Sequence, residues 1–423
     1  MESHGEHLFY QWNTCRNLSY PGVIEVHDET LRDGLQASGL RQPRLKDKLK
    51  MVALMAALGI DVADIGFPAA GPAIFEQLKN ILRYIGENKF SITTACAART
   101  VEEDIRPIVD LSQQFGIPII AYIFVGSSPI RQFVEGWNVD YILSLVEKAV
   151  TFAVKHDLLV CFVTEDTTRS KPEDLEKIYL KGIESGASRI CLCDTVGYAT
   201  PVGAAELVYF IRSVIEKRGL DVRIDWHGHN DRGLALANAL SALEAGANRI
   251  HATGLGIGER SGNTSMEQLL INLDLMGLRK LNGLKLKEYG MTISRACQVP
   301  IPDNLPILGR KVFATATGVH AAAIIKAQQM NDNWLADRVY SSVPAKELGA
   351  EQIIEIGPMS GKCNVKYFLE KNNINDESLQ EDIFNQTKKK GQMLTPRQME
   401  QLFKKHGYRY INSRENPGET IRS

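Results

Sequence analysis

The feature that most constrains this chain is a pattern that recurs eight times before residue 275: a short β-rich run, a polar turn and an amphipathic stretch. Each run is rich in Val, Ile or aromatic residues and is bounded by turn residues, which is typical of a buried strand. The stretches between the runs have helical periodicity; the first places Leu45, Leu49 and Val52 near one stripe and ends in Gly59. The predicted strands are 22–31, 61–67, 91–97, 118–126, 159–166, 189–197, 223–231 and 249–259.

Eight strand–helix units predict a closed parallel (β/α)8 barrel, the TIM barrel, which typically needs about 250 residues. The alternative is an open doubly wound sheet, in which the nucleotide-binding glycines follow the first strand. Here the glycine-rich segment 254–258 follows the eighth run, and no βαβ unit with a ribose-binding acid comes after it. We therefore predict that residues 1–280 form the barrel.

The pattern changes after residue 280, where the sequence predicts a smaller second region. The segment 281–311, with its proline-rich stretch 298–311, is predicted to be a linker. Residues 312–423 are predicted to form a mostly helical C-terminal appendix, with a helix at 316–329 and two or three short helices within 362–408.

Charge and hydropathy argue against several classes of protein. The 423 residues carry 49 Lys and Arg against 50 Asp and Glu, a net charge of −1, which argues against nucleic-acid binding through bulk charge. No apolar run approaches the roughly 20 residues needed to cross a bilayer, so no membrane association is expected. Residues 1–13 lack the features of a signal peptide, and the seven cysteines include no CxxC pair. We therefore expect a cytoplasmic protein with free thiols.

Polar side chains gather at the predicted strand ends, where barrel enzymes place their chemistry. His227 and His229 lie two residues apart on the seventh strand and so point to one face, and Gly228 between them leaves room for a ligand. Two imidazoles with a carboxylate from another strand suit a divalent metal with open positions. Asp33 is the candidate carboxylate, and the amide oxygen of Asn263 is the candidate fourth ligand. The alternative is that both histidines are hydrogen-bonded loop residues.

Three further side chains at strand ends have two interpretations each. Arg32, beside the metal site, either polarises an anionic oxygen as a permanently charged donor or forms a surface salt bridge. Glu165, at the end of the fifth strand, either acts as a base or in a water network, or is a solvated loop carboxylate. Thr195, at the end of the sixth strand, either donates to a substrate carboxylate or caps the following turn.

Three segments resemble the metal-dependent Claisen-condensing barrels, the family of 2-isopropylmalate, citramalate and homocitrate synthases, to which 3-hydroxy-3-methylglutaryl-CoA lyase is related. These segments are 28-DETLRDGLQ-36, 227-HGHNDRGLALANALSALEAGA-247 and 254-GLGIGERSGN-263. The resemblance continues into the appendix, where 318-GVHAAAI-324 and 340-YSSVPAKELG-349 look like the synthases' catalytic histidine and tyrosine segments.

The resemblance implies an acyltransferase that condenses acetyl-CoA with a 2-oxoacid and hydrolyses the thioester, most closely a 2-isopropylmalate synthase of leucine biosynthesis. It implies a divalent metal (Mg, Mn or Zn) that makes the ketone electrophilic. The residues that the resemblance assigns to this metal are Asp33, His227 and His229, with Asn263 nearby or bound.

The resemblance also assigns roles around the metal. Arg32 neutralises oxyanion charge and Thr195 binds the 2-oxoacid carboxylate. Glu165, His320 and Tyr340 take part in proton transfer. Because the last two come from the partner subunit's appendix in this family, the resemblance implies a homodimer with shared active sites.

The choice of 2-oxoacid stays open. Homocitrate synthases carry an arginine for the distal carboxylate of 2-oxoglutarate where this chain has Cys161. Isopropylmalate synthases usually have a histidine where it has Arg131 and a serine where it has Val163. Arg131 suits a distal carboxylate, whereas Val163 indicates an apolar pocket, so homocitrate- and citramalate-type synthases are alternatives. A 3-hydroxy-3-methylglutaryl-CoA lyase is a further alternative, which the absence of the lyases' loop cysteine from 259–261 disfavours.

Overall fold

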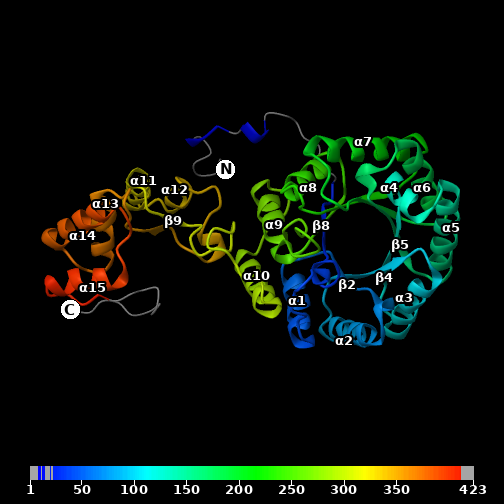
Figure 1. The fold of residues 1–423 in the computed structure, drawn as a ribbon, viewed down its shortest axis with the longest axis horizontal. Helices are drawn as coiled ribbons and strands as arrows, with labels where there is room; N and C mark the ends of the chain where they lie inside the picture. Colours follow the sequence, from blue (N-terminus) through cyan, green and yellow to red (C-terminus); the bar gives the residue numbers. More distant parts are fainter. Residues whose placement is uncertain (1–7, 11, 15–19, 21, 411–423) are drawn as a thin grey trace. The chain divides into compact units, whose positions relative to one another are not determined.

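The computed structural model describes residues 8–10, 12–14, 20 and 22–410. The chain divides into two compact units, one of which is Asn13–Pro300 and the other Met1–Trp12 together with Ile301–Ser423. The first unit holds the barrel and the second holds the appendix (Figure 1).

Eight parallel strands close into a barrel in chain order, and β8 pairs with β1 to complete it (Figure 1). The predicted TIM barrel is therefore confirmed, and each of its eight strands overlaps a predicted run. The strands are β1 (Glu25–Asp28), β2 (Val62–Gly66), β3 (Thr93–Arg99), β4 (Ile119–Gly126), β5 (Leu159–Glu165), β6 (Arg189–Asp194), β7 (Arg223–Gly228) and β8 (Arg249–Ala252).

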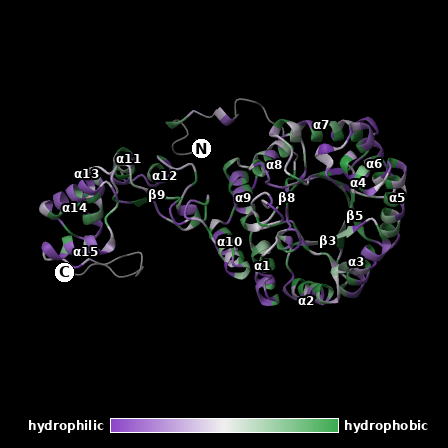
Figure 2. Cartoon of the chain, in the orientation of Figure 1, coloured by the Kyte–Doolittle hydropathy of each residue, from purple (hydrophilic) through white to green (hydrophobic). Residues whose placement is uncertain are grey.

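Helices surround the barrel, and all of them except the short α4 bury apolar side chains on one face. Helix α2, for example, buries Leu78, Ile81 and Ile85 at helical spacing, and Figure 2 shows hydrophobic and hydrophilic segments mixed along every outer helix. The helices of this unit are α1 (Leu45–Ala57), α2 (Pro72–Asn88), α3 (Glu102–Phe115), α4 (Pro129–Glu135), α5 (Val139–Lys155), α6 (Pro172–Glu184), α7 (Pro201–Lys217), α8 (Ala235–Glu244), α9 (Met266–Leu275) and α10 (Gly283–Cys297).

Helix α10 lies where the sequence predicts a linker. It packs against α1 and buries Leu286, Tyr289 and Ile293, and the Tyr289 hydroxyl donates to the Asp28 carboxylate at the end of β1. The barrel unit therefore extends to residue 300 rather than ending at 280. The apolar spacing of 286, 289 and 293 indicates a helix, and the prolines that indicate a linker begin only after it.

Ion pairs occupy the amino-terminal end of the barrel. The buried Asp225 on β7 accepts hydrogen bonds from Arg189 Nε (2.9 Å) and from the Tyr122 hydroxyl (2.8 Å). Arg249 on β8 donates from Nε to Glu25 Oε2 on β1 (2.8 Å). Because buried charges must be paired, these contacts join five strands, β1, β4, β6, β7 and β8, and leave the carboxyl ends for other polar groups.

The appendix is mostly helical, as predicted. A two-stranded parallel sheet of β9 (Ala314–Thr315) and β10 (Ile353–Ile354) accompanies five helices in the described part of this unit. One apolar cluster, which includes Val365, Leu379 and Phe403, joins the last three helices. The helices are α11 (Gly318–Gln329), α12 (Asn333–Arg338), α13 (Lys362–Lys371), α14 (Glu377–Lys390) and α15 (Pro396–Lys405). Among the described residues of the whole chain, no helix has the length and apolar character that crossing a bilayer requires.

Candidate metal centre and active site

The structure brings the three predicted metal ligands together. One ligand atom from each of Asp33, His227 and His229 lies within 4.8 Å of the other two. His229 Nε2 is 3.7 Å from Asp33 Oδ2, and all three residues are buried. His227 belongs to β7 and His229 follows it, so the alternation along the strand places both rings on the inner side. Two imidazoles and a carboxylate are a donor set that suits a divalent metal.

Asn263 lies beside these three residues. Its backbone bridges to that of His229, and its Nδ2 donates to Asp33 Oδ2 (2.6 Å) and to the carbonyl of Ile257 (3.1 Å). Asn263 Oδ1 is buried and has no hydrogen-bond partner among the described residues. Since buried polar atoms normally find a partner, this unpaired acceptor atom beside the cluster fits a bound cation.

The glycines of the β8 loop allow this placement of Asn263. Gly258 has φ of +154°, and a Cβ there would overlap the Asn263 amide. A Cβ at Gly262 would overlap the carbonyl of Gly256. Only glycine therefore permits the loop to fold closely onto Asn263, which accounts for a motif that does not belong to a dinucleotide site.

Arg32 is held by three carboxylates. It donates from Nη2 to Glu29 (2.7 Å), from Nη1 to Asp33 (3.0 Å) and from Nε to Asp64 on β2 (2.8 Å). Its side chain is only 18% exposed, so it is not a solvated surface pair. Burial alone would lower the pKa of Arg32, but these carboxylates raise it well above its ordinary value. The guanidinium is therefore a fixed positive charge next to the candidate metal ligand Asp33.

Glu29 is a site residue that the sequence analysis missed. Its Oε2 lies 2.6 Å from His227 Nδ1, an ion-pair contact that leaves Nε2 as the nitrogen with which His227 would bind a metal. Burial lowers the pKa of His227, but Glu29 outweighs burial and raises it to about 9. Burial and then His227 lower the pKa of His229 to about 4. Without a metal, His227 therefore holds its proton more strongly than His229, and a bound metal would displace that proton.

Glu165, at the end of β5, pairs with Arg131 on helix α4, which follows β4. Arg131 Nε lies 3.1 Å from Glu165 Oε1, and Arg131 Nη1 lies 3.1 Å from Glu135. Burial raises the pKa of Glu165, and Arg131 opposes this effect. At the next strand end, Thr195 Oγ1 accepts the backbone N–H of Asp166 (2.8 Å). The hydroxyl proton of Thr195 is therefore available to donate to another acceptor.

His320 and Tyr340 lie together in the appendix unit. Their rings stack with centroids 4.1 Å apart and an interplanar angle of 28°. His320 is exposed and Tyr340 is 45% exposed. The two segments that the sequence analysis singled out separately thus form one exposed aromatic pair.

Comparisons with known proteins agree with the sequence resemblance. The chain is 33% identical to a 2-isopropylmalate synthase of Sulfurisphaera tokodaii, over 86% of this chain and 90% of that protein. It is 30% identical to the homocitrate synthase AksA of Methanopyrus kandleri, over 90% of this chain and 91% of that protein. It is 32% identical to the (R)-citramalate synthase CimA of Methanocaldococcus jannaschii, over 88% of this chain and 72% of that protein.

Solved structures support the fold. The HMG-CoA lyase of Bacillus subtilis superimposes with a TM-score of 0.55 at 21% identity, covering 67% of this chain and 96% of that chain. At this identity the likeness concerns the fold alone. The HMGL-like family model matches residues 23–293, which is more than half of the chain and includes all eight strands of the barrel. The protein therefore belongs to the HMGL-like family.

Proposed function

We propose that this protein condenses acetyl-CoA with a 2-oxoacid and hydrolyses the thioester, as an acyltransferase of the 2-isopropylmalate synthase type. The observation that carries the proposal is the buried cluster of Asp33, His227 and His229 beside the charged Arg32. Relatives at 30–33% identity over most of the chain are synthases of this class. Homocitrate- and citramalate-type activities remain the alternatives for the 2-oxoacid.

The three clustered side chains would hold the divalent metal, and Asn263 Oδ1 is a further donor beside them. When bound, the metal would polarise the ketone of the 2-oxoacid. Arg32 places a fixed positive charge where oxyanion charge develops, which stabilises the transition state more than the ground state. Thr195 donates its hydroxyl proton to the substrate carboxylate.

Proton transfer is assigned to Glu165, His320 and Tyr340. Glu165 has a raised pKa and a cationic neighbour, Arg131, which suits a group that exchanges a proton. Arg131 also offers a guanidinium to the distal end of the substrate. We propose that the exposed pair of His320 and Tyr340 serves the active site of a second subunit, so that the enzyme is a homodimer. We also propose that it is cytoplasmic.

The test is the release of free thiol from acetyl-CoA with 2-oxoisovalerate, pyruvate, oxaloacetate, 2-oxoglutarate and glyoxylate. We expect turnover with one of these acids, with 2-oxoisovalerate preferred. Asp33→Asn is expected to lose turnover and to bind Mn²⁺ weakly, whereas the exposed carboxylate variant Asp221→Asn should retain both. Absence of thiol release with the whole panel would refute the function, and full activity of Asp33→Asn in chelator-treated protein would refute the metal site.

A further inference from the structure

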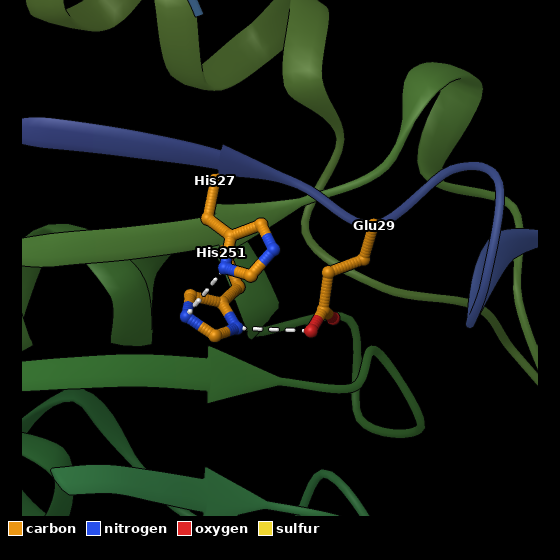
Figure 3. Close-up of side chains that lie close together, drawn as sticks. All are labelled: His27, Glu29 and His251. Atoms are coloured by element: carbon orange, nitrogen blue, oxygen red, sulfur yellow. Dashed lines mark hydrogen bonds and ion pairs between the residues drawn. The ribbon is translucent and has the colours of Figure 1, made fainter. Parts of the chain in front are cut away.

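A second cluster of metal-ligating side chains lies deeper in the barrel. His27 on β1 and His251 on β8 face each other as partners in the strand register, and Glu29 follows β1 (Figure 3). One ligand atom from each of these three residues lies within 4.8 Å of the other two. All three are at most 2% exposed. None of them is among the three residues that form the Asp33 cluster.

One nitrogen of each imidazole contacts an outer partner and the other ring. His27 Nδ1 lies 3.0 Å from the Tyr122 hydroxyl, His251 Nε2 lies 3.3 Å from Asp225 Oδ2, and these two nitrogens lie 3.2 Å apart (Figure 3). Such outer contacts fix ring orientation and tautomer in protein metal sites, and they leave the other nitrogen of each ring for the ion. Those other nitrogens, His27 Nε2 and His251 Nδ1, lie on the Glu29 side of the two rings (Figure 3). His251 Nδ1 is 3.0 Å from Glu29 Oε1.

One atom of this cluster lacks a partner. His27 Nε2 is buried and has no hydrogen bond among the described residues. Both oxygens of Glu29 are in contact, Oε1 with His251 Nδ1 and Oε2 with His227 Nδ1 at 2.6 Å. A buried imidazole nitrogen without a partner is uncommon in folded proteins. A cation that accepts its electron pair would provide the missing partner.

We propose that His27, Glu29 and His251 form a second cation site, separate from the site at Asp33. Two imidazoles and one carboxylate favour a borderline ion such as Zn²⁺ or Co²⁺ over Mg²⁺, which prefers oxygen ligands. Arg32 contacts Glu29, and Arg249 contacts Tyr122 at 2.8 Å. Because these two arginines repel a cation, the ion at His27, Glu29 and His251 binds more weakly than the ion at Asp33, His227 and His229. This inference does not depend on the proposed condensation reaction.

The number of zinc ions per chain tests the proposal. Chelator-treated protein is equilibrated with Zn²⁺ and desalted, and its zinc is then counted by elemental analysis. We expect two ions in the wild type, one in His27→Phe, one in His229→Ala and none in the double variant. His156→Phe replaces a half-buried histidine at the end of α5, outside both clusters, and should retain two. With Mg²⁺ the wild type should retain no more than one ion.

Crystals of zinc-loaded wild type give a second measurement that needs no variant. An anomalous zinc peak within bonding distance of His27 Nε2 is expected. One zinc ion per wild-type chain, two ions retained by His27→Phe, or a water in place of the zinc peak would each overturn the proposal. Because these readouts count ions, they are independent of the thiol-release assay. A protein inactive with every 2-oxoacid would still bind two zinc ions.

Discussion

Replacement of Asp225 by Asn tests whether the ion pairs at the amino-terminal end of the barrel stabilise the fold. Asp225 is fully buried. Its Oδ1 accepts from Arg189 Nε, and its Oδ2 accepts from the Tyr122 hydroxyl and from Arg249 Nη1 (3.4 Å). Asparagine keeps the volume and one acceptor oxygen, but it removes the negative charge that faces two arginines.

The expected loss of unfolding free energy depends on the ion pairs that remain in the variant. Removal of one partner of a buried ion pair typically costs about 3–5 kcal/mol, because the other charge is left uncompensated. Glu25 still pairs with Arg189 Nη2 (2.7 Å) and with Arg249 Nε (2.8 Å) in the variant. We therefore expect the free energy of unfolding of Asp225→Asn to fall by about 3 kcal/mol at pH 7, the lower end of that range.

The pH dependence gives an independent check. Burial alone would raise the pKa of Asp225, but Arg249 and Arg189 hold it well below its usual value. A lowered carboxylate pKa contributes stability that is fully present above the unfolded-state pKa, about 3.9, and is lost as the pH falls below it. The difference between wild type and variant should therefore be constant above about pH 5 and should narrow by about 1 kcal/mol at pH 3.

Urea unfolding, followed by tryptophan fluorescence, to which the buried Trp226 on β7 contributes, measures both quantities. Asp221→Asn, an exposed carboxylate just before the same strand, is the matched control and should leave stability unchanged. Equal stability of wild type and Asp225→Asn at pH 7 would refute the reasoning. A stability difference that stays the same from pH 7 to pH 3 would refute the assignment of the effect to charge.

Two further predictions concern packing and catalysis. Gly182→Ala should destabilise the protein by about 1–3 kcal/mol in urea unfolding, because the new Cβ would lie 2.5 Å from Phe162 Cδ1. Gly203→Ala, an exposed helix position whose nearest neighbour is 3.5 Å away, should be neutral or slightly stabilising; equal losses in both variants would contradict the steric explanation. His320→Ala should lower kcat without changing metal content, and mixing it with Asp33→Ala should restore activity through one intact site per mixed dimer. Wild-type rates in His320→Ala, or no recovery after verified subunit exchange, would remove the appendix from the mechanism.

The barrel could be predicted because each buried strand is a short apolar run and the runs recur with helices between them. Strand ends were less certain: the third strand is predicted at 91–97 and lies at Thr93–Arg99. Its continuation, Ala98 and Arg99, pairs with Ile123 and Phe124 of β4, and this pairing with a neighbouring strand is not visible in local composition. The sequence analysis predicts a linker where α10 lies, because the prolines that follow the helix are a stronger local signal than its short helical pattern.

The cluster of candidate metal ligands could be predicted because the spacing of His227 and His229 places both rings on one face. The role of Glu29 could not, since its partners come from distant segments; His251, for example, is 222 residues away in the chain. One feature of the sequence does indicate that Glu29 lies near His27 and His251. His27 and Glu29 alternate at the end of β1, and His251 stands on the strand that closes the barrel against β1, so all three were candidates for the inner face.

Alternation along the strands divides the barrel interior into layers, as is usual for this fold. On β7, Asp225 belongs to the ion-pair layer at the amino-terminal end, and His227 belongs to the candidate metal layer two residues further. On β1, Glu25 and His27 repeat this order, opposite Arg249 and His251 of β8. Changes in the two layers should therefore have different consequences. Loss of an ion-pair carboxylate should lower the free energy of unfolding, whereas loss of the carboxylate of Asp33 should lower turnover, because it removes a candidate metal ligand.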